Sequence, residues 1–218
     1  MIYIKKGTEP ESLTRYRKEK YAYYDGYKDK DDIRENLLKE QGHLCAYCMR
    51  RIDKEHMKIE HWYPEDKLTD VERLNYQNML GVCLGHIEGT KGSDDTCDTH
   101  KGNTEITVNP VENSTLLHIN YRSATGEIYS DNADIQKDLD ETLNLNAERH
   151  LLKANRKETL NRLVRELSRM KSKGTWNRRM LESVKSTYEK YDAEGKRKEF
   201  AGVALWYLNK QIIRNVNK

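Results

Sequence analysis

Residues 45–48 read CAYC, and three more motifs follow: IEHWYP at 59–64, NMLGVC at 78–83 and CDTHKG at 97–102. All four cysteines of the chain lie in these motifs, at Cys45, Cys48, Cys83 and Cys97. Thiolates are soft ligands that bind zinc in a tetrahedron, with Zn–S distances near ~2.3 Å. The neighbouring residues Glu60 and His61 instead offer a hard oxygen and an imidazole, which suit hydrolytic chemistry. The motifs therefore indicate two metal sites with different roles.

The composition limits the size of the hydrophobic core. The chain has 218 residues, of which 36% are hydrophobic and 34% are charged, and its mean hydropathy is -1.01. Little apolar material is left for one large core, so we expect modest cores and a sizeable polar surface. No apolar run approaches the ~20 residues needed to cross a bilayer, and residues 1–6 lack a secretory pattern. We expect a cytoplasmic protein without a membrane partner, and in that reducing compartment cysteines are more often metal ligands than disulfides.

Charge is distributed unevenly between the two parts of the chain. Residues 1–148 carry 20 Lys and Arg against 29 Asp and Glu, a net charge of -9, whereas residues 149–218 carry 19 against 7, a net charge of +12. Clustered basic residues can contact a phosphate backbone or an acidic protein surface, and they can also be the solvated faces of ordinary helices. The sequence does not choose between these partners.

The N-terminal part combines a polar arm with a first helix. Residues 1–30 are rich in tyrosine, and five of the six are interleaved with charged residues, namely Tyr16, Tyr21, Tyr23, Tyr24 and Tyr27. We expect this arm to lack a core of its own and to order against a partner, although tyrosines can also stack on bases. Asp31 and Asp32 then predict the cap of an amphipathic helix that buries Leu37 and Leu38, and Gly42 predicts its end.

The rest of the chain predicts an α+β fold. Residues 57–61 alternate like a short strand, which places Glu60 and His61 on opposite faces, and 78–83 resemble the opening of a helix or another tight element. Further strands are predicted at 106–111, 115–121 and 128–129. Three amphipathic helices follow, the first closed by Gly174. The predicted units are the arm at 1–30, a zinc-stapled ββα module with small flanking β elements at 31–130, and a basic helical domain at 131–218.

The CAYC motif has alternatives to zinc binding. A redox dithiol would need a strand before Cys45 and a helix after it, whereas the sequence predicts a helix before and a hairpin after. Unpaired buried thiols are the other alternative. Structural zinc is the favoured interpretation.

The four motifs together resemble those of the HNH, or ββα-metal, endonucleases. The pattern of that family is Cys-x-x-Cys, then Asp/Glu-His with a nearby proline, then Asn-Leu before a cysteine, and then Cys-Asn-x-x-Lys-Gly. Residues 44–48, 59–64 and 97–103 are more narrowly similar to the nuclease of Septu-type anti-phage systems, where PtuB is paired with the ATPase PtuA. Similar pairs accompany some retrons. The core of the resemblance covers about residues 37–105.

This resemblance implies a metal-dependent endonuclease that hydrolyses DNA within an anti-phage complex. It implies His61 as general base, Glu60 and Asn78 as groups around a catalytic Mg²⁺ or Mn²⁺ ion, and the four cysteines as ligands of a structural zinc ion. The partners it implies are DNA, a PtuA-type ATPase and, in a retron setting, a reverse transcriptase with its DNA–RNA product. The chain also departs from the pattern, since thirteen residues separate Cys83 from Cys97 where two are usual, and Asp98 replaces asparagine.

The departures leave several ligands open. His86 or His100 could replace the fourth cysteine at the zinc ion, and Asp98 and His100 are further candidates for the catalytic ion. Asn75 is expected to cap the element that follows it rather than to bind a metal.

The chemistry of phosphodiester hydrolysis agrees with these assignments. A histidine with a pKa near ~6.5 can deprotonate water at neutral pH, and oxygen ligands favour Mg²⁺ or Mn²⁺ over zinc. The glutamate–histidine pair alone is a weak signal, because a half-buried histidine beside a solvated glutamate is common. Two alternatives therefore stay open: a non-catalytic zinc-stapled adaptor or nucleic-acid-binding protein, and a stand-alone HNH enzyme of the restriction or mobile-element type.

Overall fold

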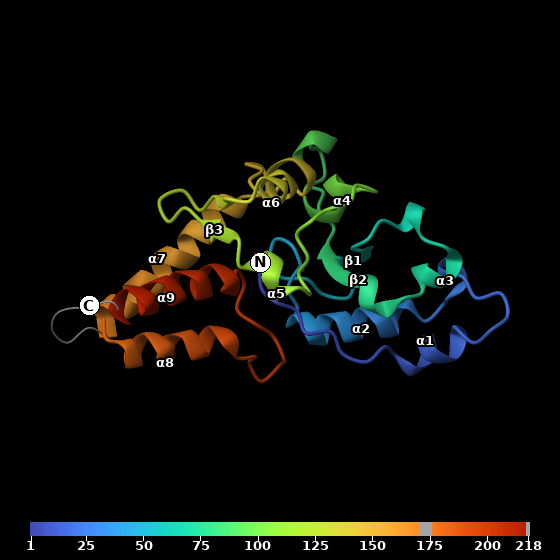
Figure 1. Cartoon of the computed structure of the whole chain (residues 1–218), viewed down its shortest axis with the longest axis horizontal. Coiled ribbons are helices and arrows are strands. Elements are labelled where there is room, and N and C mark those ends of the chain that lie inside the picture. Colours follow the sequence, from blue (N-terminus) through green and yellow to red (C-terminus); the bar gives the residue numbers. More distant parts are fainter. Residues whose placement is uncertain (171–175, 217–218) are drawn as a thin grey trace.

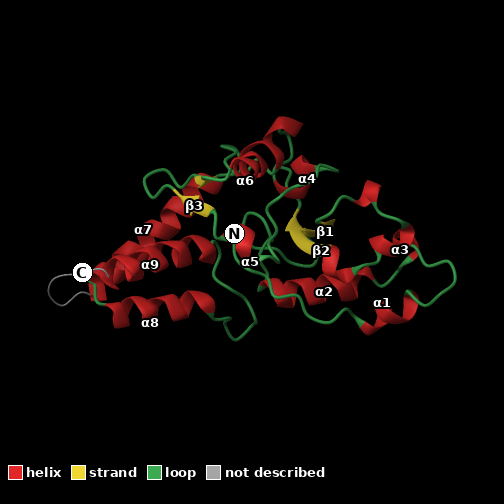
Figure 2. Ribbon diagram, in the orientation of Figure 1, coloured by secondary structure: helices red, strands yellow, loops and turns green. Residues whose placement is uncertain are grey.

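The computed structural model describes residues 1–170 and 176–216, and it shows a mixed α+β protein (Figures 1 and 2). The helices in these residues are α1 (Glu11–Tyr16), α2 (Lys30–Gln41), α3 (Asp70–Arg73), α4 (Cys97–Lys101), α5 (Asn113–Leu116), α6 (Ala133–Lys137), α7 (Leu152–Met170), α8 (Arg178–Glu189) and α9 (Ala201–Val216). The strands are β1 (Met57–His61), β2 (Met79–Cys83), β3 (Ile119–Tyr121) and β4 (Ile128–Ser130). Figure 1 shows α7, α8 and α9 side by side at one end of the molecule, with α1 and α3 at the other end.

Strands β1 and β2 form a two-stranded antiparallel sheet, in which Glu60 pairs with Leu80 and Met57 with Cys83. The expectation of a helical element at 78–83 was wrong, because only Tyr76–Asn78 form a 3-10 turn and Met79–Cys83 form the strand. Every residue of β2 is buried. A strand buried on both faces reads as a continuous apolar run, so its period is not visible in the sequence.

Helix α2 packs against this sheet and is the predicted first helix. Its predicted end is confirmed, since Gly42 takes a left-handed conformation with φ of 61°. Asp31 and Asp32 lie in the first turn rather than at the cap. In the first turn their negative charges interact favourably with the positive end of the helix dipole. The amide of Gln41 exchanges two hydrogen bonds of 2.7 Å with the backbone of Gly81, and this fixes the helix to the middle of β2.

The second sheet is smaller than predicted. Strands β3 and β4 pair antiparallel, but residues 106–111 form no strand and residues 113–116 form the helical turn α5. The carboxylate of Asp138 accepts hydrogen bonds from the backbone N–H groups of Thr107 and Val108, at 2.6 and 2.8 Å. A side chain thus satisfies the backbone donors that a neighbouring strand would otherwise have satisfied.

The N-terminal arm is part of the main hydrophobic core, contrary to the expectation that it would order against a partner. It contributes five buried side chains to the main core, namely Met1, Ile4, Leu13, Tyr24 and Tyr27. Lys6 reaches from the arm to Glu40 of α2, with 3.0 Å between Nζ and Oε2. The arm therefore orders against this chain itself, whereas Tyr21 and Tyr23 stay exposed.

The helical unit begins later than residue 131. The main core continues through α6 to Leu152 and Leu160 of α7. A second core lies between α7, α8 and α9, and its buried members are Leu163, Leu167, Leu181, Val184, Tyr188, Ala201, Ala204 and Leu208. The boundary between the two cores therefore lies within α7 and along α9, whose Val203 belongs to the main core. The three predicted C-terminal helices are present, and Gly174, the predicted end of the first, lies outside the described residues.

None of the helices described is both long and apolar enough to pass through a membrane.

Candidate functional site

The four cysteines form one buried cluster. Their Sγ atoms all lie within 4.8 Å of one another, with 3.8 Å between Cys45 and Cys97, 3.8 Å between Cys48 and Cys83, and 3.7 Å between Cys83 and Cys97. A tetrahedron with Zn–S arms of ~2.3 Å has edges of about 3.8 Å, whereas a disulfide holds its sulfurs about 2.05 Å apart. The thiols are free, and their spacing fits a zinc ion.

The pKa values of the clustered thiols also indicate that a cation would stabilise them. Hydrogen bonds from the other three thiols hold the pKa of Cys48 well below its ordinary value. Hydrogen bonds within the cluster raise the pKa of Cys83 and Cys97 well above theirs. One thiolate thus suppresses the ionisation of its neighbours, and a divalent ion at the centre would remove that penalty.

Three segments of the chain place the four cysteines. Cys45 and Cys48 lie on the turn after α2, where the N–H of Met49 donates to the carbonyl of Cys45 at 3.0 Å. Cys83 is the last residue of β2. Cys97 begins α4 in a left-handed conformation, and its N–H donates to the carbonyl of Leu143 at 2.9 Å.

Cys97, and neither His86 nor His100, is the fourth member of the cluster. The ring of His86 lies against Asp95, with 2.6 Å between Nδ1 and Oδ1, and Nδ1 of His100 donates to the carbonyl of Thr142 at 3.0 Å. Neither histidine belongs to the cluster, and Cys97 does. A helix precedes the CAYC motif, so the secondary structure expected for a redox dithiol is not present in this part of the chain.

Glu60 faces α4 and meets a second carboxyl group there. Its carboxyl group lies close enough to that of Asp98, in the first turn of α4, for the two to interact. The hydroxyl of Tyr47 donates to Glu60 Oε1 at 3.0 Å, and Nζ of Lys101 lies 2.8 Å from the same oxygen. Tyr47 lies between the first two cysteines, so the CAYC turn itself supports the carboxyl pair.

The pair joins a buried acid, Glu60, with a partly exposed one, Asp98. Burial, followed by the proximity and the negative charge of Asp98, raises the pKa of Glu60 to about 9, although the ammonium of Lys101 acts in the opposite direction. A second ammonium, Nζ of Lys58, lies 3.4 Å from Asp98 Oδ2. Lys101 is 1% exposed and Lys58 is 41% exposed, so one cation is buried with Glu60 and the other lies at the surface beside Asp98.

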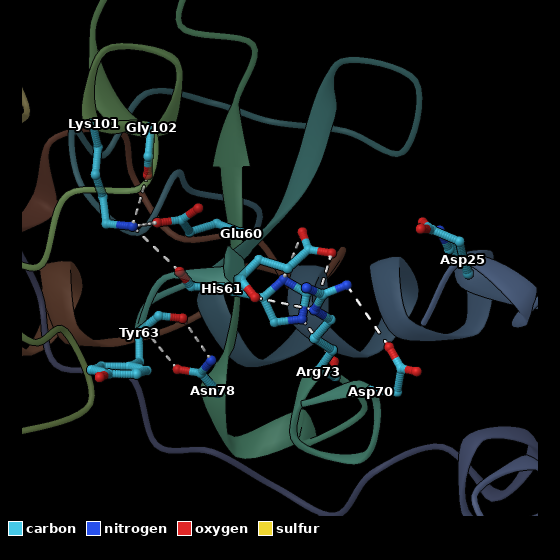
Figure 3. Close-up of polar contacts among 11 residues, drawn as sticks. Asp25, Glu60, His61, Tyr63, Asp70, Arg73, Asn78, Lys101 and Gly102 are labelled. Atoms are coloured by element: carbon cyan, nitrogen blue, oxygen red, sulfur yellow. Dashed lines mark hydrogen bonds and ion pairs between the residues drawn. The ribbon is translucent and has the colours of Figure 1, made fainter. Parts of the chain in front are cut away.

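His61 points away from this pair, to the other face of β1 (Figure 3). Its Nε2 lies 2.7 Å from the carbonyl oxygen of Arg73, which can only accept, so Nε2 carries the proton and Nδ1 keeps its lone pair. Nδ1 lies 3.7 Å from Glu65 Oε2. The ring of Tyr24 packs edge-on at a centroid distance of 4.8 Å. Burial, as the largest cause, lowers the pKa of His61, and the residue is 4% exposed.

Asn78 braces the connection between the two strands. Its Oδ1 accepts from the N–H of Tyr63 at 2.8 Å, and its Nδ2 donates to the carbonyl of Tyr63 at 3.1 Å (Figure 3). The amide is therefore engaged by the backbone and does not face Glu60. Asn75 caps the following turn, as predicted, because its Oδ1 accepts from the N–H of Gln77 at 3.1 Å.

The expected convergence of Glu60, His61 and Asn78 on one point is thus wrong for this structure. Consecutive residues of a strand point to opposite faces, which separates the first two, and the loop uses the amide of the third. The structure instead joins Glu60 to Asp98, with Tyr47, Lys58 and Lys101 around them. Two signals pointed there: Lys58 shares a strand face with Glu60 at a spacing of two, and Lys101 shares a helix face with Asp98 at a spacing of three.

No protein-family model matches the chain, and no curated protein was found to be similar to it.

Proposed function

We propose that the chain is a metal-dependent endonuclease of the HNH type that hydrolyses phosphodiester bonds of DNA. The observation that carries the proposal is the meeting of Glu60 from β1 and Asp98 from α4 beside a four-thiol centre. The order of β1, β2 and α4 along the chain is that of a ββα module. An acid followed by a histidine and a set of four cysteines are groups that the motifs of this family supply, and Asp98 adds a second acid where the pattern has asparagine.

The two metals of the proposal have different ligands. The four cysteines would hold a structural zinc ion, and Glu60 and Asp98 would hold Mg²⁺ or Mn²⁺, which prefer hard oxygens. The carboxyl pair fits such an ion, because a divalent cation would offset the negative charge of Asp98 that helps to raise the pKa of Glu60. Bound there, the ion would neutralise charge that develops on the phosphate. Asn78 is not among these ligands, since both of its amide atoms bond to the backbone of Tyr63. Nδ1 of His100 bonds to Thr142, which leaves its Nε2 as a further candidate ligand.

The residues of the chain have separable roles in this proposal. His61 accepts a proton from water at Nδ1, and the carbonyl of Arg73 fixes its ring and tautomer. Lys101 balances the charge of Glu60, and the half-exposed Lys58 contacts the phosphate. In the described residues one edge of β1 is unpaired, so a phosphodiester lying across the end of this strand would meet both faces.

The test is nicking of supercoiled plasmid by the purified chain with added Mg²⁺ or Mn²⁺. His61→Ala should reduce the rate by about 10²–10⁴-fold, the usual contribution of a general base. Asp98→Asn should raise the concentration of Mn²⁺ needed for half-maximal cleavage. His86→Ala is the matched control, because it removes an exposed histidine bonded to Asp95. Unchanged zinc content would show that the variants fold, and equal nicking by parent and His61→Ala would refute the proposal.

The cellular setting is part of the same proposal. We expect the chain to act in an anti-phage complex with a PtuA-type ATPase, and in a retron setting also with a reverse transcriptase and its DNA–RNA product. This part depends on the resemblance of residues 44–48, 59–64 and 97–103. Co-expression with the neighbouring genes, followed by affinity purification, should recover an ATPase in stoichiometric amount.

One observation favours a second candidate, a zinc-stapled adaptor without catalysis. His61 is 4% exposed, and its neighbours Tyr24, Arg73 and Glu65 account for the surroundings of its ring. An adaptor would contain zinc and bind its partner or nucleic acid, but Mg²⁺ and Mn²⁺ would give no cleavage at any pH, with or without the partner.

A further inference from the structure

Helix α7 carries a row of arginines on its outer side. Arg162, Arg165 and Arg169, with Glu166 and Met170, line an open hollow of about 480 Å³. All three arginines are exposed, and they lie far along the chain from the carboxyl pair on β1 and α4. This hollow is separate from the site described above.

We propose that this arginine row binds the phosphate backbone of a nucleic acid. The proposal rests on the proposed function, because it gives the nuclease a second contact with its substrate, away from the place of cleavage. It also selects one of the two partners that the basic C-terminal part allows.

The spacing of the row fits a phosphate backbone. Positions 162, 165 and 169 follow at intervals of three and four, so they share one face of the helix. With a rise of 1.5 Å per residue the row is about 10 Å long. One strand of a duplex advances ~3.4 Å along the axis per phosphate, so the row is long enough to meet several phosphates. The opposite side of α7 buries Leu160, Leu163 and Leu167, which holds the row in a fixed orientation.

The charge of α7 favours an anionic ligand. The helix contains six basic and two acidic residues, and one of the six, Arg156, is buried. Of the acids, Glu158 pairs with Arg165 at 2.7 Å, but the two side chains are 51% and 58% exposed. An ion pair as exposed as this contributes little and is easily exchanged for a phosphate. Guanidinium groups also match phosphate oxygens with two parallel hydrogen bonds.

The side chains between the arginines argue against a protein partner. Among the described residues of α7, the one large hydrophobic side chain that is exposed is Met170, at the end of the helix. Protein interfaces usually have an apolar or aromatic centre surrounded by a polar rim. The row has no such centre, and its positive charge is complementary to a polyanion.

The test is binding of single- and double-stranded oligonucleotides to the full chain in EDTA, followed by fluorescence anisotropy over a range of salt concentrations. The triple variant Arg162→Gln, Arg165→Gln, Arg169→Gln should weaken binding at least about tenfold at 50 mM salt. The slope of log affinity against log salt should become shallower by about 0.9 for each lost phosphate contact, or about 2.7 for three. A triple replacement by lysine should keep the slope and lose part of the affinity.

The matched control makes the same change of charge elsewhere in the basic part, with Lys185→Gln, Lys190→Gln and Lys196→Gln. This control should leave the slope within about one unit of the parent. Equal weakening by both triple variants would show an effect of net charge and overturn the proposal, as would an unchanged slope in the arginine variant. An arginine variant that binds DNA normally but no longer retains a co-purified protein would show that the row binds a protein.

These measurements need no cleavage. If the parent binds DNA through the row and fails to nick plasmid, the row is confirmed and the proposed function fails. If the parent nicks plasmid and the row variant binds DNA like the parent, the proposed function is supported and the arginine row is refuted as a DNA contact.

Discussion

The cysteine module and the helical unit are held together in different ways. In the first, two five-residue strands and a five-residue helix surround four thiols. In the second, α7, α8 and α9 share an apolar core, and in the described residues no group of metal-ligating side chains lies there. The first part lies in the main hydrophobic core, but it also buries four thiols that only a bound ion would hold together. We therefore expect the first part to depend on an ion as well as on packing, whereas the helices depend on packing alone. We therefore predict that zinc removal unfolds the cysteine module and that cavities in the core unfold the helical unit.

Removal of zinc should have the largest effect. Apparent zinc-binding energies in small finger peptides are about 10–16 kcal/mol, so chelation or Cys83→Ser should unfold the module outright. The α-helices of the C-terminal unit should persist, which circular dichroism would show as retained helical signal with lost tertiary signal. A variant that keeps one zinc ion per chain and the parental melting temperature would contradict the comparison.

A cavity in the second core should have the next largest effect. Leu181 on α8 is fully buried, and Leu181→Ala should lower the free energy of unfolding of the helical unit by about 2–5 kcal/mol. Zinc content should stay at the parental value, because the residue is remote from the thiols. Exposed Leu117, 75% accessible, supplies the control Leu117→Ala, for which a denaturant midpoint close to that of the parent is expected. Loss of zinc from the Leu181 variant would show that the two parts unfold as one.

Tyr47→Phe tests the link from the zinc turn to the carboxyl pair. The change removes one buried hydrogen bond to Glu60 and leaves the ring in place, while Lys101 still contacts the same oxygen, so stability should fall by about 0.5–1.5 kcal/mol, the net contribution of one hydrogen bond. Zinc binding should be retained while the affinity for Mn²⁺ falls, as measured by titration calorimetry. An exposed hydroxyl is removed in the control Tyr21→Phe. Equal Mn²⁺ affinity in all three proteins would remove Tyr47 from the site.

The smallest expected effect is a pH dependence of stability that arises at the contact between Arg50 and His150. His150 is buried, and the guanidinium of Arg50, next to the zinc turn, contacts its ring nitrogen and its carbonyl. Burial, followed by the charge of Arg50, lowers the pKa of His150, so the unfolded chain takes up a proton at a higher pH than the folded chain. Stability should therefore fall as the pH decreases below about 6.5, by at most about 1.4 kcal/mol per pH unit from this residue.

Urea denaturation at pH 7.5 and 5.5 would measure this dependence. His150→Gln should reduce the loss of stability on acidification, and the exposed control His56→Gln should not. If the loss is the same in all three proteins, another buried group, such as His61, is responsible.

The sequence predicted the parts of the site that depend on local chemistry. Cysteine spacing predicted the zinc-sized cluster, and alternation placed Glu60 and His61 on opposite faces of one strand. The helical periods of α2, α7, α8 and α9 were also visible. By contrast, β2 was mistaken for a helical element because both of its faces are buried, and residues 106–111 resembled a strand although Asp138 satisfies their backbone.

What the sequence determined by itself is the set of ligands and the periodic elements, because thiolate chemistry and side-chain period need no knowledge of distant neighbours. Tertiary structure alone decided which groups meet: Asp98 and not Asn78 with Glu60, Cys97 and neither histidine with the other thiols, and the arm with its own core. The reason is that these contacts join residues far apart in the chain, and their geometry follows from how the elements pack.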